Sequence, residues 1–499
     1  MGKYRLEFIV FISGAVVMIF ELVGSRVLGP HLGNSIFIWT SIIGVILGSL
    51  SLGYWLGGKW ADKGASYRFL SLILLVSGVL MGLMNLFKDQ LLIFISAQIS
   101  DIRWTGLLGA LLLFALPSIL LGTVSPYAVK LKINSLERSG RTVGNLYAIS
   151  TLGSIVGTFA AGFWLIPFFG TSRIIYILAI VLIFLSVVSA ATKNLKTKVS
   201  AAVLLLLLTI FNISFFTSHG ILDFDTQYSR VLIYDRQDRI SGRPVRFMNI
   251  DRMPSSAMFL DGDDLFFDYL KFYQLSQYLN PTAKSALLIG GAGYVYPRHF
   301  LKSFPEATMD VVEIDPKLTD LAREYFSLED SSRLHIYHED GRMFLNNNNN
   351  HKYDLVFMDA FNSFYSIPFQ LTTREAVQKI YEALEDDGLV ISNIISPLSS
   401  EEGVFLRAEY STYRSIFPQV YLFPTKDSQN HKLIQNVILL AFKSPAEPNW
   451  QSENEEYQNY LSHLWPADIY NEGLILSDEQ APVDYYINKM LKLVSAGAK

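Results

Sequence analysis

The stretch Leu287–Phe300, LLIGGAGYVYPRHF, decides the fold of the second half of the chain. It opens with an apolar run typical of a buried strand, Gly290, Gly291 and Gly293 follow at once, and a helix is expected from about Tyr296. Glycines in such a strand–turn–helix unit let the backbone approach a ligand closely, and the helix amino terminus offers N–H groups to it. The stretch therefore predicts a turn that binds a nucleotide or nucleoside.

Strands and helices alternate on both sides of this turn, from residue 281 onward. Strands are expected at 284–290, 308–314, 334–339, 353–359, 389–395, 419–425 and 436–442, with helices between most of them. This alternation predicts a parallel, doubly wound α/β sheet.

Acidic residues end the next three strands of the predicted sheet. Glu313 lies 20 residues after Gly293, where an acid can accept both hydroxyls of a ribose. Asp340 and the backbone of Gly341 follow the third strand, where an adenine amino group and ring nitrogen could be read, and Asp359 ends the fourth strand over the crevice. Either aspartate alone could be a turn or helix-cap residue, but four strands that deliver suitable groups to one edge favour an adenosine site.

The first 217 residues have the composition of a membrane domain. The chain has 499 residues, of which 51% are hydrophobic and 17% charged, so it is too apolar for one soluble globule and too long for one domain. A membrane span needs about 20 apolar residues. Seven runs meet this length, near 8–28, 36–58, 69–87, 106–129, 144–168, 173–192 and 199–217. The short apolar piece Leu91–Ile99 is expected to lie in the membrane interface, and the glycines of LGSLSLGYWLGG to serve close helix packing.

Two charged residues fall within or at the end of the first predicted span. Glu21 and Arg26 are five residues apart, which places them about 140° apart around a helix, so they need not pair with each other. Because ionisable groups inside a membrane are costly, each is expected to face a partner or a cavity. They could line a cavity for the acceptor, or serve as an interhelical salt bridge or snorkelling side chains.

The distribution of positive charge conflicts with the predicted number of spans. The amino terminus and the loops at 59–68, 130–141 and 193–198 carry twelve Lys and Arg, whereas the other three loops carry about four. The positive-inside rule puts the twelve in the cytoplasm. With seven spans the soluble part would then lie outside, where adenosyl donors are scarce, so the sequence leaves the side of the soluble part open.

Composition excludes several classes of function. The net charge of −4 is spread without a basic run, so no nucleic acid partner is expected. The chain has no cysteine, which excludes disulfides, Cys-ligated zinc, Fe–S clusters and thiolate catalysis, and no metal is expected in the site.

The order LLIGGAG, VVEIDP, HEDGR, YDLVFMDAF and LTTREAVQKIYEALEDDGLVISN is similar to that of the spermidine synthase family. The resemblance implies a methyltransferase-like Rossmann fold. LDGDDLFFDYLKFYQL looks like the segment that links the family's small amino-terminal sheet to its main domain, and TQYSRVLIYD, RPVRFMNID and SSAMFLDG read as short antiparallel strands before it. ELVGSRVLGPHLGNS, GYWLGGKWADK, SPYAVKL and GNLYAISTLGSIVGTFAAGF resemble a subfamily with a multi-pass membrane region.

The expected organisation has three parts. Residues 1–217 form a multi-pass α-helical membrane domain of about seven helices, residues 218–280 a small antiparallel β-subdomain with its linking helix, and residues 281–499 a spermidine-synthase-like Rossmann domain. The implied partners are a small-molecule amine and the lipid bilayer, with a homodimer possible.

The sequence departs from the family pattern at three positions. An aspartate that receives the amino group of decarboxylated S-adenosylmethionine is replaced by Ala292, and a second aspartate that binds the diamine is replaced by Asn362. A tyrosine–glutamine pair becomes Tyr228 followed by Ser229. Each lost charged hydrogen bond is worth roughly 1.5 to 3 kcal/mol. What remains of the family pattern is the part that holds the adenosine.

The resemblance implies in-line transfer of an alkyl group from a sulfonium donor to a neutral amine, with Asp359 as the base and Tyr269 orienting the nucleophile. The first hypothesis is aminopropyl transfer from decarboxylated S-adenosylmethionine. Because Ala292 removes a negative charge that would repel a carboxylate, methyl transfer from S-adenosylmethionine is an alternative. The third hypothesis is a non-enzymatic sensor or transporter of polyamines or nucleosides.

Overall fold

A computed structural model describes residues 4–99, 101–133, 139–190, 200, 203, 220–348, 351–360, 367–398, 401–466 and 468–496. It contains two compact units, Met1–Arg230 and Val231–Lys499.

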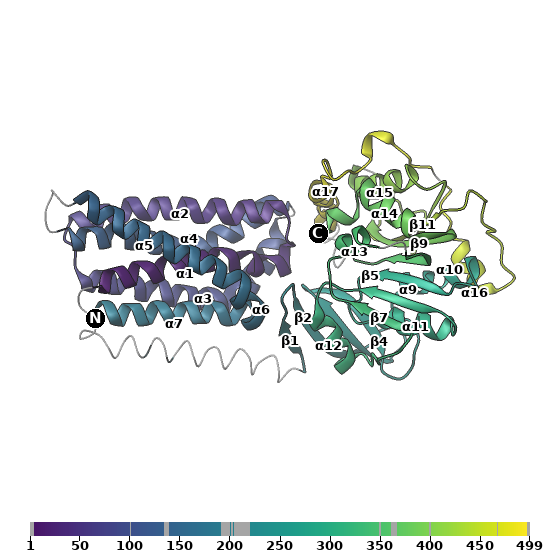
Figure 1. Cartoon of the computed structure of the whole chain (residues 1–499), viewed down its shortest axis with the longest axis horizontal. Coiled ribbons are helices and arrows are strands. Elements are labelled where there is room, and N and C mark those ends of the chain that lie inside the picture. The colour runs from purple at the N-terminus through teal and green to yellow at the C-terminus, as the bar shows by residue number, and fades with distance from the viewer. Residues whose placement is uncertain are drawn as a thin grey trace. The chain divides into compact units, whose positions relative to one another are not determined.

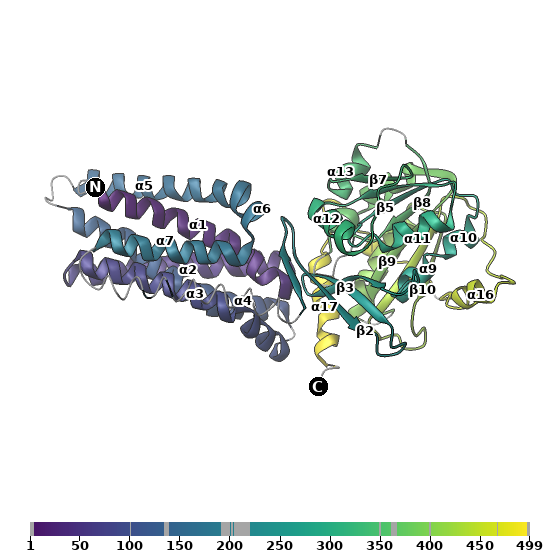
Figure 2. The same cartoon turned by 90° about the horizontal axis from the view of Figure 1, so that it is seen from below.

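The first unit is a bundle of long apolar helices that run side by side (Figures 1 and 2). The helices are α1 (Arg5–Leu32), α2 (Ile36–Asp62), α3 (Tyr67–Gln98), α4 (Ile102–Lys132), α5 (Ser139–Ala160), the π-helical turn η2 (Ala161–Leu165), α6 (Ile166–Phe169) and α7 (Thr171–Ser189). In the described part of the chain, six helical stretches are long and apolar enough to cross a membrane. They correspond to the first six predicted spans, whereas the seventh, 199–217, lies outside the described residues.

One prediction for this unit is wrong. Leu91–Ile99 was expected to be a separate interfacial piece, but residues up to Gln98 continue α3 without a break. Asn85, Lys88 and Asp89 interrupt the apolar pattern, which hid the continuity. Lys88 donates hydrogen bonds to Asn85 and to the Ser172 hydroxyl, both of 2.6 Å, so the interruption is a buried polar contact inside the bundle.

Two of the four glycines in LGSLSLGYWLGG, Gly53 and Gly57, serve close helix packing, as the sequence predicts, whereas a Cβ at Gly48 or Gly58 would meet nothing within 4 Å. A Cβ atom at Gly57 would lie 2.7 Å from the Thr123 backbone of α4. Gly122, on α4, is equally tight, because its Cβ would lie 2.8 Å from the Leu50 carbonyl oxygen. The backbones of α2 and α4 can approach this closely only because these positions carry no side chain.

A small antiparallel sheet opens the second unit. Its strands are β2 (Arg230–Gln237), β3 (Pro244–Ile250) and β4 (Met253–Phe259), paired in that order, and the short strand β1 (Leu222–Asp225) precedes them in the chain. Each of the three predicted segments overlaps one of these strands. Asp251 and Arg252, both with positive φ, form the tight turn between β3 and β4.

The main sheet has seven strands in the order β10-β11-β9-β8-β5-β6-β7. The strands are β5 (Ser285–Ile289), β6 (Thr308–Val312), β7 (Leu334–Tyr337), β8 (Tyr353–Met358), β9 (Leu384–Ser396), β10 (Gln419–Pro424) and β11 (Gln435–Phe442). Each overlaps a predicted strand. The prediction of a wholly parallel sheet is wrong at one end, because β11 is antiparallel to both β9 and β10. No helix lies between β10 and β11, and a parallel pair needs such a crossover.

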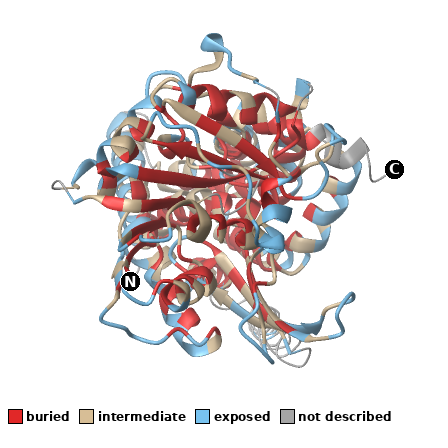
Figure 3. Cartoon of the chain, turned by 90° about the vertical axis from the view of Figure 1, so that its right-hand side faces the viewer, coloured by how far each residue is buried: buried red, intermediate tan, exposed pale blue. Residues whose placement is uncertain are grey.

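Helices cover both faces of this sheet. They are α9 (Asp268–Phe272), α10 (Leu275–Leu279), α11 (Val295–Ser303), α12 (Pro316–Tyr325), α13 (Gly341–Asn346), α14 (Arg374–Ala383), α15 (Val404–Arg414), α16 (Glu455–Leu461) and α17 (Val483–Ala496). Buried residues line the strands and the inner faces of the helices (Figure 3). The predicted doubly wound α/β fold is confirmed.

The two neighbouring glycines of α2 allow a matched test of bundle packing. Gly57→Ala should lower the free energy of unfolding in detergent by about 1 to 3 kcal/mol, because the added methyl group meets the α4 backbone. A Cβ atom at Gly58 would have no neighbour within 4 Å. Gly58→Ala should therefore be neutral or stabilise the protein by up to about 1 kcal/mol, since alanine favours the helix more than glycine does. Thermal unfolding in the same detergent compares the two variants, and equal stabilities would contradict the tight α2–α4 contact.

Candidate active site

The glycine turn between β5 and α11 has an unusual backbone. Gly290 has φ of 100°, and two non-glycine residues, Ala292 and Tyr294, have φ of 44° and 54°. Gly293 donates its N–H to the Ser256 hydroxyl of β4 at 2.9 Å, and a Cβ at this position would lie 2.7 Å from the Ser256 Cβ. The turn is therefore held against the small sheet as well as the main one.

Gly290 also sets the distance between two neighbouring strands at their carboxyl ends. A Cβ atom there would lie 2.5 Å from the Asp359 carbonyl oxygen and 3.0 Å from the Ala360 Cα. The Asp359 N–H donates to the Ile289 carbonyl at 3.0 Å, which continues the pairing of β5 with β8. Asp359 thus stands directly beside the glycine turn, as the strand-end pattern predicts.

The Asp359 carboxylate is held by neutral donors. The Tyr269 hydroxyl of α9 donates to Oδ2 at 3.3 Å, and the Asn393 amide of β9 donates to Oδ1 at 3.1 Å. The buried Tyr273 hydroxyl also lies close enough to the carboxylate to interact with it. Burial raises the pKa of Asp359 to about 7, against the opposing effect of these donors. A carboxyl group with such a pKa can exchange a proton near neutrality.

A cavity of about 730 Å³ opens in front of this carboxyl group. Its described lining includes Gly290, Gly291, Ala292, Tyr269 and Asp359. Further lining comes from the small sheet and from the β9 and β11 side, for example Ser255, Ser256, Asn393, Lys426 and Asn436. The cavity is large enough for a small-molecule ligand.

Glu313 does not face this cavity in the described lining. Its buried carboxylate accepts hydrogen bonds from the N–H groups of Gly291 (2.9 Å), Ala292 (3.0 Å) and Asp315 (3.0 Å). Burial raises the pKa of Glu313, and the three N–H donors act against this effect. In the structure, Glu313 therefore fixes the backbone of the glycine turn.

Asp340 caps a helix, which the sequence left as its alternative role. Its Oδ1 accepts from the N–H groups of Arg342 and Met343, at 2.9 and 3.1 Å, at the start of α13. The adjacent Gly341 packs against the end of β5, since a Cβ there would lie 2.7 Å from the Ile289 side chain. Both residues therefore lie at the predicted sheet edge.

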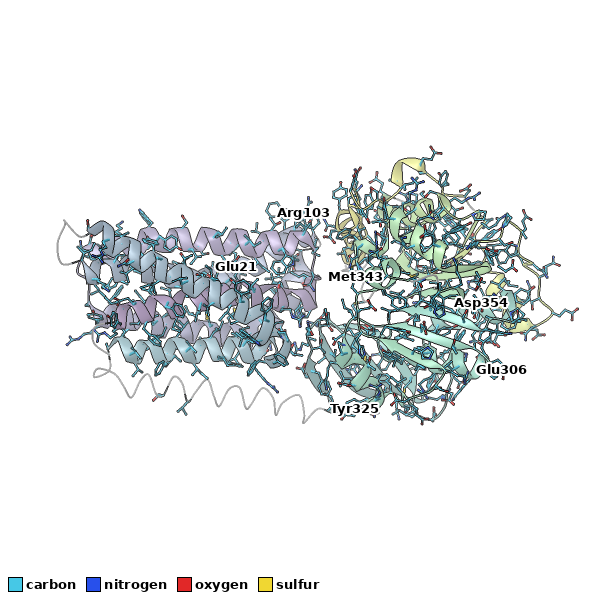
Figure 4. The ribbon with its side chains drawn as sticks, viewed as in Figure 1. Glu21, Arg103, Glu306, Tyr325, Met343 and Asp354 are labelled. Atoms are coloured by element: carbon cyan, nitrogen blue, oxygen red, sulfur yellow. The ribbon has the colours of Figure 1, made fainter. Side chains whose placement is uncertain are left out.

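The other predicted site residues are not among the described residues that line this cavity. Asn362 lies outside the described residues. Tyr228, an exposed residue of the turn that precedes β2, belongs to the first unit, as do Glu21 and Arg26. Arg26 donates to the Thr226 carbonyl at 2.7 Å, and Glu21 is half-buried along α1 (Figure 4).

Four site residues were missed by sequence reasoning: Ser256, Tyr273, Asn393 and Asn436. Only Asn393 carried a usable signal, because it lies near the carboxyl end of a predicted strand, like Asp359. Ser256 lies on the small sheet, Tyr273 directly after α9 and Asn436 on the antiparallel strand β11. None of them lies at the carboxyl end of a parallel strand, which is where the sequence pattern places site residues.

Comparison with known proteins gives consistent results. The sequence profile of the Spermine/spermidine synthase domain matches residues 273–427. The polyamine aminopropyltransferase of Vibrio vulnificus is 28% identical over 207 residues, which cover 41% of this chain and 65% of that protein. The polyamine aminopropyltransferase of Lachnospira eligens is 30% identical over 225 residues, 40% of this chain and 75% of that protein.

Among solved structures, a probable spermidine synthase from Corynebacterium glutamicum is similar, with a TM-score of 0.41 and 20% identity over 48% of this chain and 85% of that one. The chain spans less than two thirds of the length of the Vibrio relative. With 30% identity over three quarters of the Lachnospira protein, the chain belongs to the polyamine aminopropyltransferase family.

Proposed function

We propose that this chain is a membrane-bound transferase that moves an aminopropyl group from decarboxylated S-adenosylmethionine to an amine. The observation that carries the proposal is a half-buried carboxyl group, Asp359, which has a pKa of about 7 and lines a cavity beside a glycine turn. Membership of the aminopropyltransferase family supports this choice of reaction. The six apolar helices support attachment to a membrane.

The proposed reaction needs a neutral amine and a nearby base. The amine nitrogen attacks the propyl carbon of the sulfonium donor, the carbon–sulfur bond breaks, and methylthioadenosine leaves with the electron pair on sulfur. The proton lost by the nitrogen passes to the carboxylate of Asp359. Tyr269, hydrogen-bonded to Oδ2, orients the carboxylate and the incoming amine.

Glu313 would contact the donor ribose through Oε1. Its Oε2 accepts two backbone N–H groups and its Oε1 accepts one, so one acceptor position of Oε1 is left for a hydroxyl. A second ribose hydroxyl would have to replace an N–H of the glycine turn. Donor binding is then linked to the conformation of that turn.

Ala292 favours one alternative, methyl transfer from S-adenosylmethionine. It lines the cavity at the position where the family resemblance implies an aspartate. An aspartate there would attract the free ammonium of the decarboxylated donor and repel the carboxylate of the ordinary donor, and Ala292 does neither. The family membership still favours aminopropyl transfer as the first candidate.

Asp359→Asn tests the proposed base. The amide keeps the shape but cannot take the proton, so single-turnover transfer should fall by roughly 10² to 10⁴ while donor binding changes little. In the wild type the rate should fall as the pH drops below about 7, because the protonated carboxyl group cannot act as a base. Asp330→Asn, at an exposed carboxylate paired with Arg323, is the control and should retain wild-type turnover. Undiminished turnover in Asp359→Asn would reject this residue as the base.

Ala292→Asp tests the identity of the donor. The variant should bind decarboxylated S-adenosylmethionine more tightly and S-adenosylmethionine more weakly, each by about tenfold, since one charge attracts an ammonium and repels a carboxylate. Isothermal titration of the full chain with both donors measures the two shifts. If both affinities move in the same direction, Ala292 does not face the donor tail, and the case for methyl transfer is lost.

A further inference from the structure

A chain of two amides extends behind the Asp359 carboxylate. Asn393, on β9, is buried and donates to Asp359 Oδ1 at 3.1 Å. Asn436, on β11, donates in turn to the Asn393 side-chain oxygen at 2.9 Å. In the antiparallel pair, Asn393 lies opposite Ile438 and Asn436 opposite Ile395, so the two amides are diagonal neighbours on one face of the sheet.

The orientation of the Asn393 amide determines which form of Asp359 it favours. With its NH₂ group towards Asp359, it stabilises the carboxylate, whereas its oxygen would instead accept a proton from the neutral acid. The bond from Asn436 occupies that oxygen and leaves the NH₂ group for Asp359. We propose that Asn436, which does not touch Asp359, is a positioning residue that keeps the Asn393 amide turned so that Asp359 can receive the proton of the amine. This proposal rests on the proposed role of Asp359 as the base.

Two other groups contact the Asp359 carboxylate and could influence its protonation. The hydroxyls of Tyr269 and Tyr273 face the carboxylate from α9 and from the turn after it, and both stay protonated because burial raises their pKa. The other charged side chains in the described lining of the cavity are Asp238, Asp268, Lys271 and Lys426. Removal of the Asn436 amide therefore frees the Asn393 oxygen without changing a charge.

Asn436→Leu should raise the midpoint of the acid limb of the pH–rate profile by about one pH unit. Asn436→Gln, which keeps an NH₂ donor, should restore most of the wild-type midpoint. An unmoved midpoint in Asn436→Leu, or an equal shift in both variants, would overturn the proposal.

A second readout separates this proposal from the proposed function. The carboxyl infrared band that disappears in Asp359→Asn can be titrated in the full chain without any turnover. Its midpoint should also be higher in Asn436→Leu than in wild type. If the band shifts in Asn436→Leu but the wild type shows no turnover, the transferase proposal alone is contradicted. If the wild type turns over but the band does not shift in Asn436→Leu, the role of Asn436 alone is contradicted.

A different observation concerns the side of the membrane from which the second unit emerges. Several described basic residues of these segments lie at one end of the bundle, which we call the Tyr67 end. The Arg5 guanidinium lies 3.8 Å from the centre of the Tyr67 ring, and the Ser189 hydroxyl at the end of α7 donates to the Tyr67 carbonyl at 3.1 Å. At the neighbouring ends of α2 and α4, Lys130 pairs with Asp62 at 2.8 Å.

Residues 223–230 are fixed at the other end, which we call the Asp89 end. Arg230 pairs with Asp89 at 3.1 Å and with Asp223 at 2.8 Å, and Arg26 donates to the Thr226 carbonyl at 2.7 Å. Along α3, Tyr67 and Asp89 are separated by about 33 Å, the thickness of a bilayer core. Val231, the first residue of the second unit, follows Arg230 directly.

Charge then assigns the two ends to the two sides of the membrane. The segments that carry twelve Lys and Arg include the described residues of the Tyr67 end, which the positive-inside rule places in the cytoplasm. We infer that the chain leaves the membrane unit on the non-cytoplasmic side, so that the cavity of the second unit takes its ligands from that compartment. The inference does not rest on the proposed reaction, but it requires that the adenosyl donor of that reaction be supplied outside the cytoplasm.

The absence of cysteine makes this inference directly testable. Single substitutions Ile240→Cys (98% exposed, second unit), Arg103→Cys (start of α4, Asp89 end; Figure 4) and Lys63→Cys (exposed, Tyr67 end) can be labelled in intact cells with a membrane-impermeant maleimide. Ile240→Cys and Arg103→Cys should react in intact cells, and Lys63→Cys only after permeabilisation. Labelling of Lys63→Cys alone in intact cells, or of Ile240→Cys only after permeabilisation, would overturn the assignment.

Discussion

The candidate site depends on one constraint: the half-buried Asp359 carboxyl group is held by neutral donors, with no ion pair to a cation among the described residues. Because Gly290 has no side chain, the end of β5 can lie close to the backbone of Asp359 at the end of β8. Tyr269 and Asn393 supply the neutral hydrogen-bond donors. A lysine or arginine in their place would lower the pKa of Asp359 and leave it a weaker base. Neutral donors instead fix its orientation while burial keeps its proton affinity close to what catalysis at neutral pH requires.

This arrangement has a cost in stability. The pKa of Asp359 rises from 3.8 to about 7 on folding, so the folded state binds this proton more tightly than the unfolded state does. Stability from this group is therefore present at low pH and is lost as the pH rises from about 3.8 to about 7, by about 4 kcal/mol in all. The rest of the domain must offset that loss at neutral pH, which fits the tight packing around the glycine turn.

The sequence predicted this fold well where local pattern determines it. All seven strands of the main sheet and the position of Asp359 follow from apolar runs and strand ends. The antiparallel direction of β11 was missed, because a short apolar strand has the same pattern in either direction. Asn436 and Ser256 were missed because they reach the site across long separations in sequence. For Glu313 the position at the end of a strand was predicted, but its partners were not. Its hydrogen bonds from the N–H groups of Gly291 and Ala292 depend on the geometry of the turn, which the sequence pattern does not specify.

The hairpin that ends the main sheet also restricts how the second unit can assemble. β10 is an outer strand, and a long unpaired edge invites pairing with another chain. Here the Trp465 N–H donates to the Leu422 carbonyl at 2.9 Å, and the Trp450 ring packs on Tyr421 and Phe423. A second copy cannot extend the sheet at this point without displacing that segment, so any homodimer has to use side-chain surfaces or the opposite edge at β7.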